Sequence, residues 1–273
     1  MLIEQEQVEV QTQTGPMTIF IVKPKIQGYP NAKFPGVVVY SEIYQVTGPV
    51  LRFAQQIAAQ GYIVAAPCVF HEFAGAAAIP YDVPGTDAGN SYKVKKLLSA
   101  IDEDNKASID VLVSHQNCNG RIATTGMCLG GHLAFRGALD PRVKAAVCYF
   151  PTDIHSASLS PDGDDSLVRA SNGEIEGEVV LIFGTQDGHV PPEGRTFIRE
   201  QLTAKSVHAP LKLSFLELQA NHAFIRDEFS KGRYDAGISK VCFELLLETF
   251  NRTIGTDLGE FEAPNKGDGK LVC

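Results

Sequence analysis

Short apolar runs rich in β-branched residues recur along the chain, and segments of mixed polarity separate them. The run Val37, Val38 and Val39 has no polar alternation, which is typical of a strand buried on both faces of a sheet. We predict the strands of this sheet at residues 36–41, 62–66, 121–125, 143–149, 179–183 and 211–216. Two further runs, at 8–12 and 17–22, flank a Gly-Pro step and are expected to form an antiparallel pair at one edge.

The segments between these strands include amphipathic ones with helical spacing. They predict helices at residues 48–60, 90–115, 129–139, 191–205 and 234–251. The segment 67–89 contains three prolines and is expected to be a loop. The polar segment 154–176, rich in serine and aspartate, is expected to be an excursion over the sheet.

Strands that alternate with helices predict an α/β fold with a mostly parallel central β-sheet flanked by helices on both faces. The chain has no internal repeat and no linker that divides it, so residues 1–273 are expected to form a single domain with its core at about 8–252. The tail 253–273, which ends at Cys273, is expected to be loosely held, with an exposed terminal thiol.

Composition narrows the class of protein. Hydrophobic residues make up 44% of the 273 residues, an ordinary globular balance, and the formal net charge of −8 argues against nucleic-acid binding. No apolar run approaches the roughly 20 residues that span a bilayer, and the N-terminus shows no signal-peptide pattern. The six cysteines are scattered without a Cys-x-x-Cys pair, which favours reduced thiols. We expect a cytoplasmic protein that binds neither a membrane nor nucleic acid.

The most informative local pattern is residues 126–131, with the sequence GMCLGG, between a predicted strand and a predicted helix. It matches the nucleophile elbow G-x-S-x-G with cysteine in place of serine. The turn is sharp, so Gly126 and Gly130 must be small, and Cys128 would stand at the carboxyl end of a central strand. The positive partial charge of the helix N-terminus favours a thiolate there. The alternative is a buried cysteine without chemistry.

Two later loops supply the groups that such a nucleophile needs. Asp187 follows one predicted strand and His222 follows the next, so nucleophile, acid and histidine come in the order typical of α/β hydrolases. All three are expected to converge at one edge of the sheet. Two alternatives stay open: Asp187 as a cap of the following helix, and His189 in place of His222 as the base.

Four blocks of sequence together resemble the dienelactone hydrolase family. They are residues 41–44 (SEIY), 126–131 (GMCLGG), 184–191 (GTQDGHVP) and 221–224 (NHAF). The resemblance implies an α/β-hydrolase fold and a cysteine-dependent hydrolase that opens lactones or cleaves carboxylic esters. It implies a small-molecule substrate, no cofactor and no metal, with the chain as a monomer or homodimer.

The resemblance also implies catalytic roles. It makes Cys128 the nucleophile, His222 the general base and acid, and Asp187 the carboxylate that orients His222, so that hydrolysis passes through an acyl-enzyme. It implies that Glu42 hydrogen-bonds the resting thiol and releases it when substrate arrives. The alternative for Glu42, without the resemblance, is a solvated loop carboxylate.

Substrate contacts follow from the same resemblance. The backbone N–H groups of Leu129 and Ile43 would form the oxyanion hole. Relatives that act on anionic dienelactone hold its carboxylate with two arginines. Arg226 matches the second, with a surface ion pair as its alternative. The segment where the first should lie contains no arginine, so His71 is a candidate for its place, and Tyr44 is a further candidate contact.

Two function classes compete with the hydrolase. One is a non-catalytic α/β-hydrolase relative that binds a small molecule or acts as a scaffold. The other is a thiol redox protein, which needs a resolving cysteine that the neighbours of Cys128 do not supply.

Overall fold

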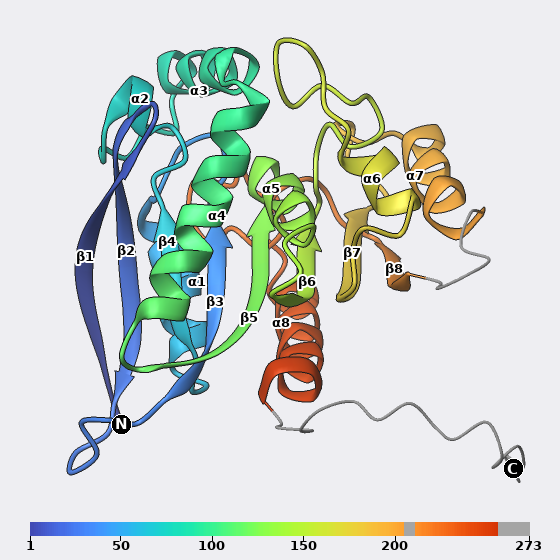
Figure 1. Cartoon of the computed structure of the whole chain (residues 1–273). Helices are drawn as coiled ribbons and strands as arrows, with labels where there is room; N and C mark the ends of the chain where they lie inside the picture. Colours follow the sequence, from blue (N-terminus) through green and yellow to red (C-terminus); the bar gives the residue numbers. More distant parts are fainter. Residues whose placement is uncertain (205–210, 256–273) are drawn as a thin grey trace, which may run out of the picture.

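The computed structural model describes residues 1–204 and 211–255, and this part of the chain contains one eight-stranded sheet (Figure 1). The strands are β1 (Leu2–Thr12), β2 (Gly15–Lys25), β3 (Phe34–Tyr40), β4 (Ile63–Pro67), β5 (Cys118–Met127), β6 (Val143–Tyr149), β7 (Glu178–Gly184) and β8 (Lys212–Leu218). Their order is β1-β2-β4-β3-β5-β6-β7-β8. β1 pairs antiparallel with β2, and β2 pairs antiparallel with β4. The other neighbouring strands pair parallel. The predicted mostly parallel sheet is confirmed.

Helices cover both faces of the sheet. In the described part of the chain they are α1 (Gly48–Ala58), α2 (His71–Ala74), α3 (Val83–Lys95), α4 (Leu98–Ser114), α5 (Leu129–Gly137), α6 (Ser166–Ser171), α7 (Pro192–Ala204), α8 (Ala236–Phe250) and the π-helix η1 (Asn251–Gly255). Ile109 of α4 and Leu133 of α5 belong to one hydrophobic core, whereas Ile57 of α1 and Leu246 of α8 belong to the other. Among these helices none combines the length and the apolar character needed to cross a bilayer.

The central strand β3 is apolar along its whole length because both of its faces are covered. Val38 and Tyr40 of β3 pack in the core beneath α4 and α5, whereas Val37 and Val39 pack in the core beneath α1 and α8. Successive side chains of a strand point to opposite faces. A strand between two helical layers therefore buries an apolar residue at every position, which is the pattern from which this strand was predicted.

The segment 67–89 differs from the predicted loop, because it contains α2 and the first half of α3. Asp82 caps α3, and its carboxylate accepts a hydrogen bond of 2.7 Å from the backbone N–H of Gly85. Gly85 has no room for a side chain, because a Cβ would lie 2.0 Å from the carbonyl oxygen of Pro80. The proline and glycine residues that suggested a loop mark a helix start instead.

The predicted helix 90–115 is two helices, α3 and α4, with a break at Lys96. The backbone of Lys96 is extended (ψ 127°), and its side chain turns into the interior. There its ammonium forms ion pairs of 2.6 Å with Glu72 and 2.8 Å with Asp104. A buried cation has to be paired, and this pairing accompanies the break in the helix.

The ends of several elements also differ from the prediction. The β1–β2 hairpin pairs from Leu2 to Lys25, well beyond the apolar runs from which it was predicted, because backbone pairing continues through polar residues. Residues 253–255 belong to η1. The remainder of the predicted tail, with Cys273, lies outside the described residues.

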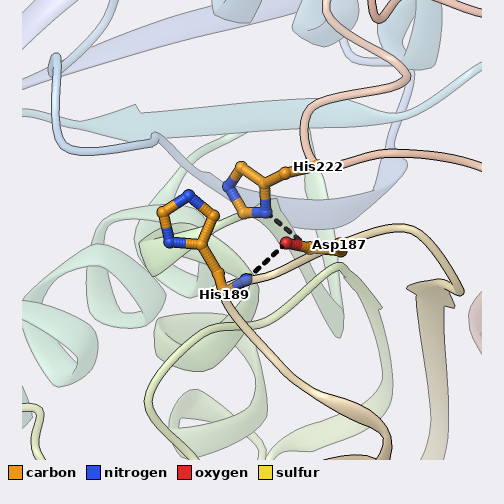
Figure 2. Close-up of side chains that lie close together, drawn as sticks. All are labelled: Asp187, His189 and His222. Carbon is orange, nitrogen blue, oxygen red and sulfur yellow. Dashed lines mark hydrogen bonds and ion pairs between the residues drawn. The ribbon is translucent and has the colours of Figure 1, made fainter.

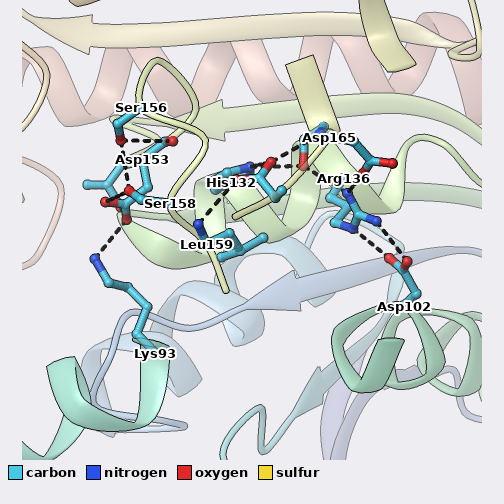
Figure 3. A network of polar contacts seen from close by, with 12 residues as sticks. Lys93, Asp102, His132, Arg136, Asp153, Ser156, Ser158, Leu159 and Asp165 are labelled. Atoms are coloured by element: carbon cyan, nitrogen blue, oxygen red, sulfur yellow. Dashed lines mark hydrogen bonds and ion pairs between the residues drawn. The ribbon is translucent and has the colours of Figure 1, made fainter. Parts of the chain in front are cut away.

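The excursion between β6 and β7 contains α6 and is fixed to neighbouring helices by polar contacts (Figure 3). The contacts are His132 to Ser166 at 3.0 Å, Arg136 to Asp165 at 2.7 Å, and Lys93 to Asp153 at 2.9 Å. His132 and Arg136 belong to α5, the helix that follows Cys128, and both are buried. The excursion is thus attached to the same helix that positions the predicted nucleophile.

Candidate active site

Cys128 occupies a strained turn between β5 and α5. Its backbone lies in the left-handed region, with φ 59° and ψ −122°, which a non-glycine residue rarely adopts. The neighbouring glycines have no space for side chains. A Cβ on Gly126 would lie 2.3 Å from the carbonyl oxygen of Gly130, and a Cβ on Gly130 would lie 2.2 Å from that of Tyr40. The structure therefore contains the geometry of a nucleophile elbow.

The loops that follow the parallel strands enclose a cavity of about 220 Å³. Its wall includes Ile43 and Tyr44 after β3, Cys128 after β5, Asp153 after β6, His189 after β7 and His222 after β8. Ligands of open α/β sheets bind at the carboxyl ends of the strands. The convergence expected from the order of the motifs is observed here.

Asp187 contacts both of its neighbouring histidines (Figure 2). Its Oδ2 lies 2.6 Å from Nδ1 of His222, and its Oδ1 accepts a hydrogen bond of 2.8 Å from the backbone N–H of His189. The side chain of Asp187 is 1% exposed. The sequence left His189 open as an alternative to His222. The structure favours His222 as the partner of Asp187, because His189 reaches this carboxylate only through its backbone.

Charge and burial set the protonation of this pair. Burial disfavours the charged form of His222, but Cys128 and Asp187 outweigh it and raise the pKa of His222 to about 10. Burial also disfavours the carboxylate of Asp187, but the hydrogen bond with His222 holds the pKa of Asp187 below its usual value. These contacts therefore stabilise the imidazolium that forms when His222 accepts a proton. Burial and the charge of His222 hold the pKa of His189 below its usual value.

Glu42 and Arg226 form a buried ion pair at the cavity. Nη1 of Arg226 donates to both carboxylate oxygens of Glu42, at 3.0 and 3.1 Å, and the two residues are 2% and 4% exposed. The hydroxyl of Tyr81 also donates to Glu42 at 3.4 Å, and the guanidinium lies 4.5 Å from the Tyr81 ring centroid. Neither alternative from the sequence, a solvated carboxylate or a surface ion pair, describes these residues. A hydrogen bond from the Cys128 thiol to Glu42 stays a prediction.

Leu129 and Ile43 have backbone N–H groups where the oxyanion hole is predicted. Leu129 is the first residue of α5, so its N–H is one of the donors that a helix start leaves without an intrahelical acceptor. Ile43 follows β3 and lines the cavity. Within residues 1–204 and 211–255, neither N–H donates to a protein acceptor. Tyr44 lines the same cavity, and its hydroxyl lies 3.0 Å from that of Thr86.

His71 is a correction to the sequence prediction. It is the first residue of α2, and its side chain is 1% exposed and packs against α4, where its Nε2 lies 3.2 Å from Asp104. It is absent from the described wall of the cavity. His71 follows the carboxyl end of β4, as predicted, but the short helix α2 turns it toward the charged cluster around Lys96. A buried imidazole is stabilised by such polar partners.

The structure adds cations that the sequence reasoning missed. Lys93, Lys231 and Arg233 line the cavity. Lys93 pairs with Asp153, whereas the ion pairs of residues 1–204 and 211–255 include no carboxylate partner for Lys231 or Arg233. Both lie less than a dozen residues after His222, in a loop to which the sequence reasoning assigned only Arg226. Their proximity to the histidine block was the available signal.

Cys128 differs from the other described thiols in its access to solvent. Cys68, Cys118, Cys148 and Cys242 are buried, and Cys128 is half-buried. Burial raises the pKa of Cys68 to about 12 and that of Cys242 to about 11. Cys128 is therefore the most accessible thiol among the described cysteines. Cys148 and Cys242 lie in the hydrophobic core.

Comparison with known proteins places this architecture among lactone and ester hydrolases. A sequence profile of the dienelactone hydrolase family matches residues 20–254. A protein of Saccharomyces cerevisiae, provisionally named a carboxymethylenebutenolidase, is 55% identical over 271 residues, or 97% of each chain. The carboxymethylenebutenolidase of Pseudomonas putida is 27% identical over 206 residues, which cover 73% of this chain and 79% of its own.

A solved structure shows the same fold at low identity. It is a dienelactone hydrolase-like promiscuous phosphotriesterase from metagenomic libraries, with a TM-score of 0.72 and 17% identity. The match covers 92% of this chain and 98% of the other. The likeness confirms the predicted α/β-hydrolase fold and carries nothing further about the reaction.

Proposed function

Because the chain belongs to the dienelactone hydrolase family, we propose that it hydrolyses lactones and carboxylic esters with a Cys-His-Asp triad of Cys128, His222 and Asp187. The observation that carries the proposal is the hydrogen bond of 2.6 Å between His222 Nδ1 and Asp187 Oδ2. It leaves Nε2 of His222 for the thiol of Cys128, which lines the same cavity. A nucleophile beside an oriented base is the arrangement that covalent catalysis requires.

In the first half of the reaction, the thiol proton of Cys128 passes to His222 and the sulfur attacks the substrate carbonyl carbon. The carbonyl oxygen becomes an oxyanion, which the N–H groups of Leu129 and Ile43 stabilise. The C–O bond of the lactone or ester then breaks, and His222 donates its proton to the leaving oxygen. The product of this half is a thioester on Cys128.

In the second half, water hydrolyses the thioester. His222 takes a proton from the water, whose oxygen attacks the thioester carbonyl. The C–S bond breaks, the acid is released, and the proton on His222 restores the thiol. Asp187 stabilises the imidazolium in both halves through the bond to Nδ1.

Substrate charge connects Arg226 with Glu42. In the structure their charges neutralise each other. A substrate carboxylate that pairs with Arg226 would free Glu42 to accept a hydrogen bond from the Cys128 thiol, so the nucleophile would be activated when the anionic substrate is present. Lys231 and Arg233 supply the further positive charge that the missing first arginine would have supplied. The proposed substrates are therefore anionic lactones or esters.

Substitution of the nucleophile tests the proposal. Cys128→Ala should abolish hydrolysis of an anionic dienelactone and of a p-nitrophenyl ester, and mass spectrometry of the wild type quenched during turnover should find the acyl group on Cys128. The matched control is Cys242→Ala, which removes a buried thiol of α8. A Cys128→Ala variant with the wild-type rate would refute the triad. Binding of the lactone without turnover or adduct would indicate the non-catalytic alternative.

A further inference from the structure

The loop after β3 contains Gln45, a buried residue in an unusual conformation. Its backbone lies in the left-handed region, with φ 60°, and the residue is fully buried. A residue other than glycine rarely adopts this conformation, and it persists there only when the surrounding structure holds it. The contacts of its side chain therefore have to offset the strain. The proposed hydrolysis assigns no task to Gln45.

The side-chain amide of Gln45 is anchored to the segment that follows β4. Its Oε1 accepts a hydrogen bond of 2.9 Å from the backbone N–H of Phe70, just before α2. Its Nε2 donates to the carbonyl oxygens of Gly75 at 3.0 Å and Ala77 at 2.9 Å, just after α2. The acceptor and both N–H groups of the amide are thus used, and this single side chain brackets the whole of α2.

The backbone of Gln45 holds the peptide unit that carries a predicted oxyanion donor. Its N–H donates to the carbonyl oxygen of Glu42 at 3.3 Å and closes a turn with Ile43 and Tyr44 at its centre. The carbonyl of Glu42 and the N–H of Ile43 belong to one planar trans peptide unit, so they point in opposite directions. A bond that fixes this carbonyl therefore also fixes the direction of the N–H of Ile43.

Two further contacts hold the same turn from other sides. The N–H of Ile79 donates to the carbonyl oxygen of Tyr44 at 2.9 Å. In α3, Gly89 packs so closely against the turn that a Cβ there would lie 2.3 Å from the carbonyl oxygen of Ile43. These contacts confine the turn, and Gln45 is the residue that joins it to both ends of α2.

We infer that Gln45 is a positioning residue of the predicted oxyanion hole, an inference that rests on the proposed hydrolysis. Its side chain holds the residue in the left-handed conformation, and its N–H then directs the peptide unit between Glu42 and Ile43, the residue that lines the cavity. An oxyanion donor is effective only if it is in place before the reaction begins. Gln45, which is absent from the described wall of the cavity, supplies this preorganisation through the turn.

Gln45→Met tests the inference, because methionine has a similar length and flexibility but no amide. We expect kcat for a neutral p-nitrophenyl ester to fall about ten-fold or more, with KM little changed. The reason is that a displaced oxyanion donor weakens binding of the transition state and not of the substrate. Steady-state kinetics of the folded variant measure both constants.

The matched control is Asn117→Leu, immediately before β5 and at the opposite end of that strand from Cys128. The amide of Asn117 also bridges two loop carbonyls, those of Pro30 at 3.1 Å and Ala32 at 2.9 Å. Asn117→Leu should lower the stability, as Gln45→Met does, but leave kcat unchanged. Equal kcat values in the two variants would overturn the inference, because a purely structural role of Gln45 predicts them.

A second variant and a second measurement make the test independent of folding and of the reaction. Gln45→Gly adopts φ 60° without strain and should show the same loss of kcat if Gln45→Met does not fold. Hydrogen–deuterium exchange of residues 42–47 should be faster in both Gln45 variants than in the wild type and unchanged in Asn117→Leu. Exchange at the wild-type rate in the Gln45 variants contradicts the anchor. A wild type that hydrolyses no lactone or ester removes the proposed function, whereas an active wild type matched in kcat by the Gln45 variants removes only this inference.

Discussion

At the scale of single residues, Asp187 is the group that orients His222, because its two oxygens hold the imidazole on one side and the backbone of the following loop on the other. Asp187→Asn keeps the shape but presents an N–H where His222 needs an acceptor. We expect kcat to fall by about 10⁴-fold with KM little changed. The exposed Asp162→Asn in the excursion is the control, with an unchanged rate. A loss below ten-fold for Asp187→Asn would contradict the assigned role.

The buried pair of Arg226 and Glu42 makes Arg226 a structural residue as well as a proposed substrate contact. Arg226→Met removes the guanidinium and leaves the carboxylate of Glu42 buried without its partner. We expect the free energy of unfolding to fall by about 3 kcal/mol, measured by urea denaturation. Arg52→Met is the control, because Arg52 pairs with Asp227 and Glu228 at an exposed site, where such pairs contribute about 0–1 kcal/mol. Equal losses in both variants would show that the pair is not the cause.

Arg233 is the cleaner residue for a test of substrate charge, because it has no carboxylate partner within residues 1–204 and 211–255. Arg233→Gln should raise KM for an anionic dienelactone about ten-fold and leave KM for a neutral p-nitrophenyl ester unchanged. Steady-state kinetics on the two substrates measure this difference. If both values of KM move together, Arg233 does not recognise the anion.

At the scale of elements, the start of α5 packs so closely against the end of β3 that only glycine fits at position 130. A Cβ on Gly130 would lie 2.2 Å from the carbonyl oxygen of Tyr40 and 2.6 Å from that of Ser41, so α5 must move away from the end of β3. We expect Gly130→Ala to cost about 2 kcal/mol of stability and to lower kcat at least about 100-fold, since the N–H of Leu129 moves with the helix. Unfolding curves and initial rates measure the two effects.

A glycine in α8 provides the matched control for this substitution. A Cβ on Gly237 would have ordinary contact, 3.5 Å from Asp235. Gly237→Ala should leave the rate unchanged and keep or increase the stability, because alanine favours a helix. A wild-type rate in Gly130→Ala would show that the close approach does not position the oxyanion hole.

The helices α3 and α4 show where pattern reasoning about elements stops. The helical periodicity continues through Lys96 and predicted a single helix. The ion-pair partners of Lys96 are Glu72 of α2 and Asp104 of α4. The same limit applies to His71, whose place after β4 suggested a cavity residue. The packing of α2 against α4 decides the positions of both side chains. No local spacing in the sequence predicts this packing.

At the scale of the whole molecule, stability should depend on pH through His222. Its pKa is about 10 in the folded chain, against 6.5 for an ordinary histidine. A proton bound more tightly in the folded state stabilises that state fully below about pH 6.5, and the contribution is lost as the pH rises through about 10. In Asp187→Asn the carboxylate whose hydrogen bond and charge help to raise this pKa is absent. The fall in unfolding free energy from pH 6 to pH 10 should shrink by about 1 kcal/mol or more.

Urea denaturation at pH 6, 8 and 10 measures this difference, and His115→Gln serves as a control at a surface histidine. The comparison between variants removes the contribution of other groups that titrate in this range. An identical pH dependence in wild type and Asp187→Asn would show that the carboxylate and His222 are not coupled.

The sequence by itself determined the alternation of strands and helices, the elbow at Cys128, and the order of Asp187 and His222 behind it. These features are local: strand periodicity, glycines at a tight turn and positions after strands follow from backbone geometry. Only the tertiary structure decided that Glu42 pairs with Arg226, that His71 faces Asp104, and that Lys231, Arg233 and His189 line the cavity. The partner of a side chain depends on which distant elements pack beside it. Burial strengthens the resulting polar contacts, but it leaves no pattern in the nearby sequence.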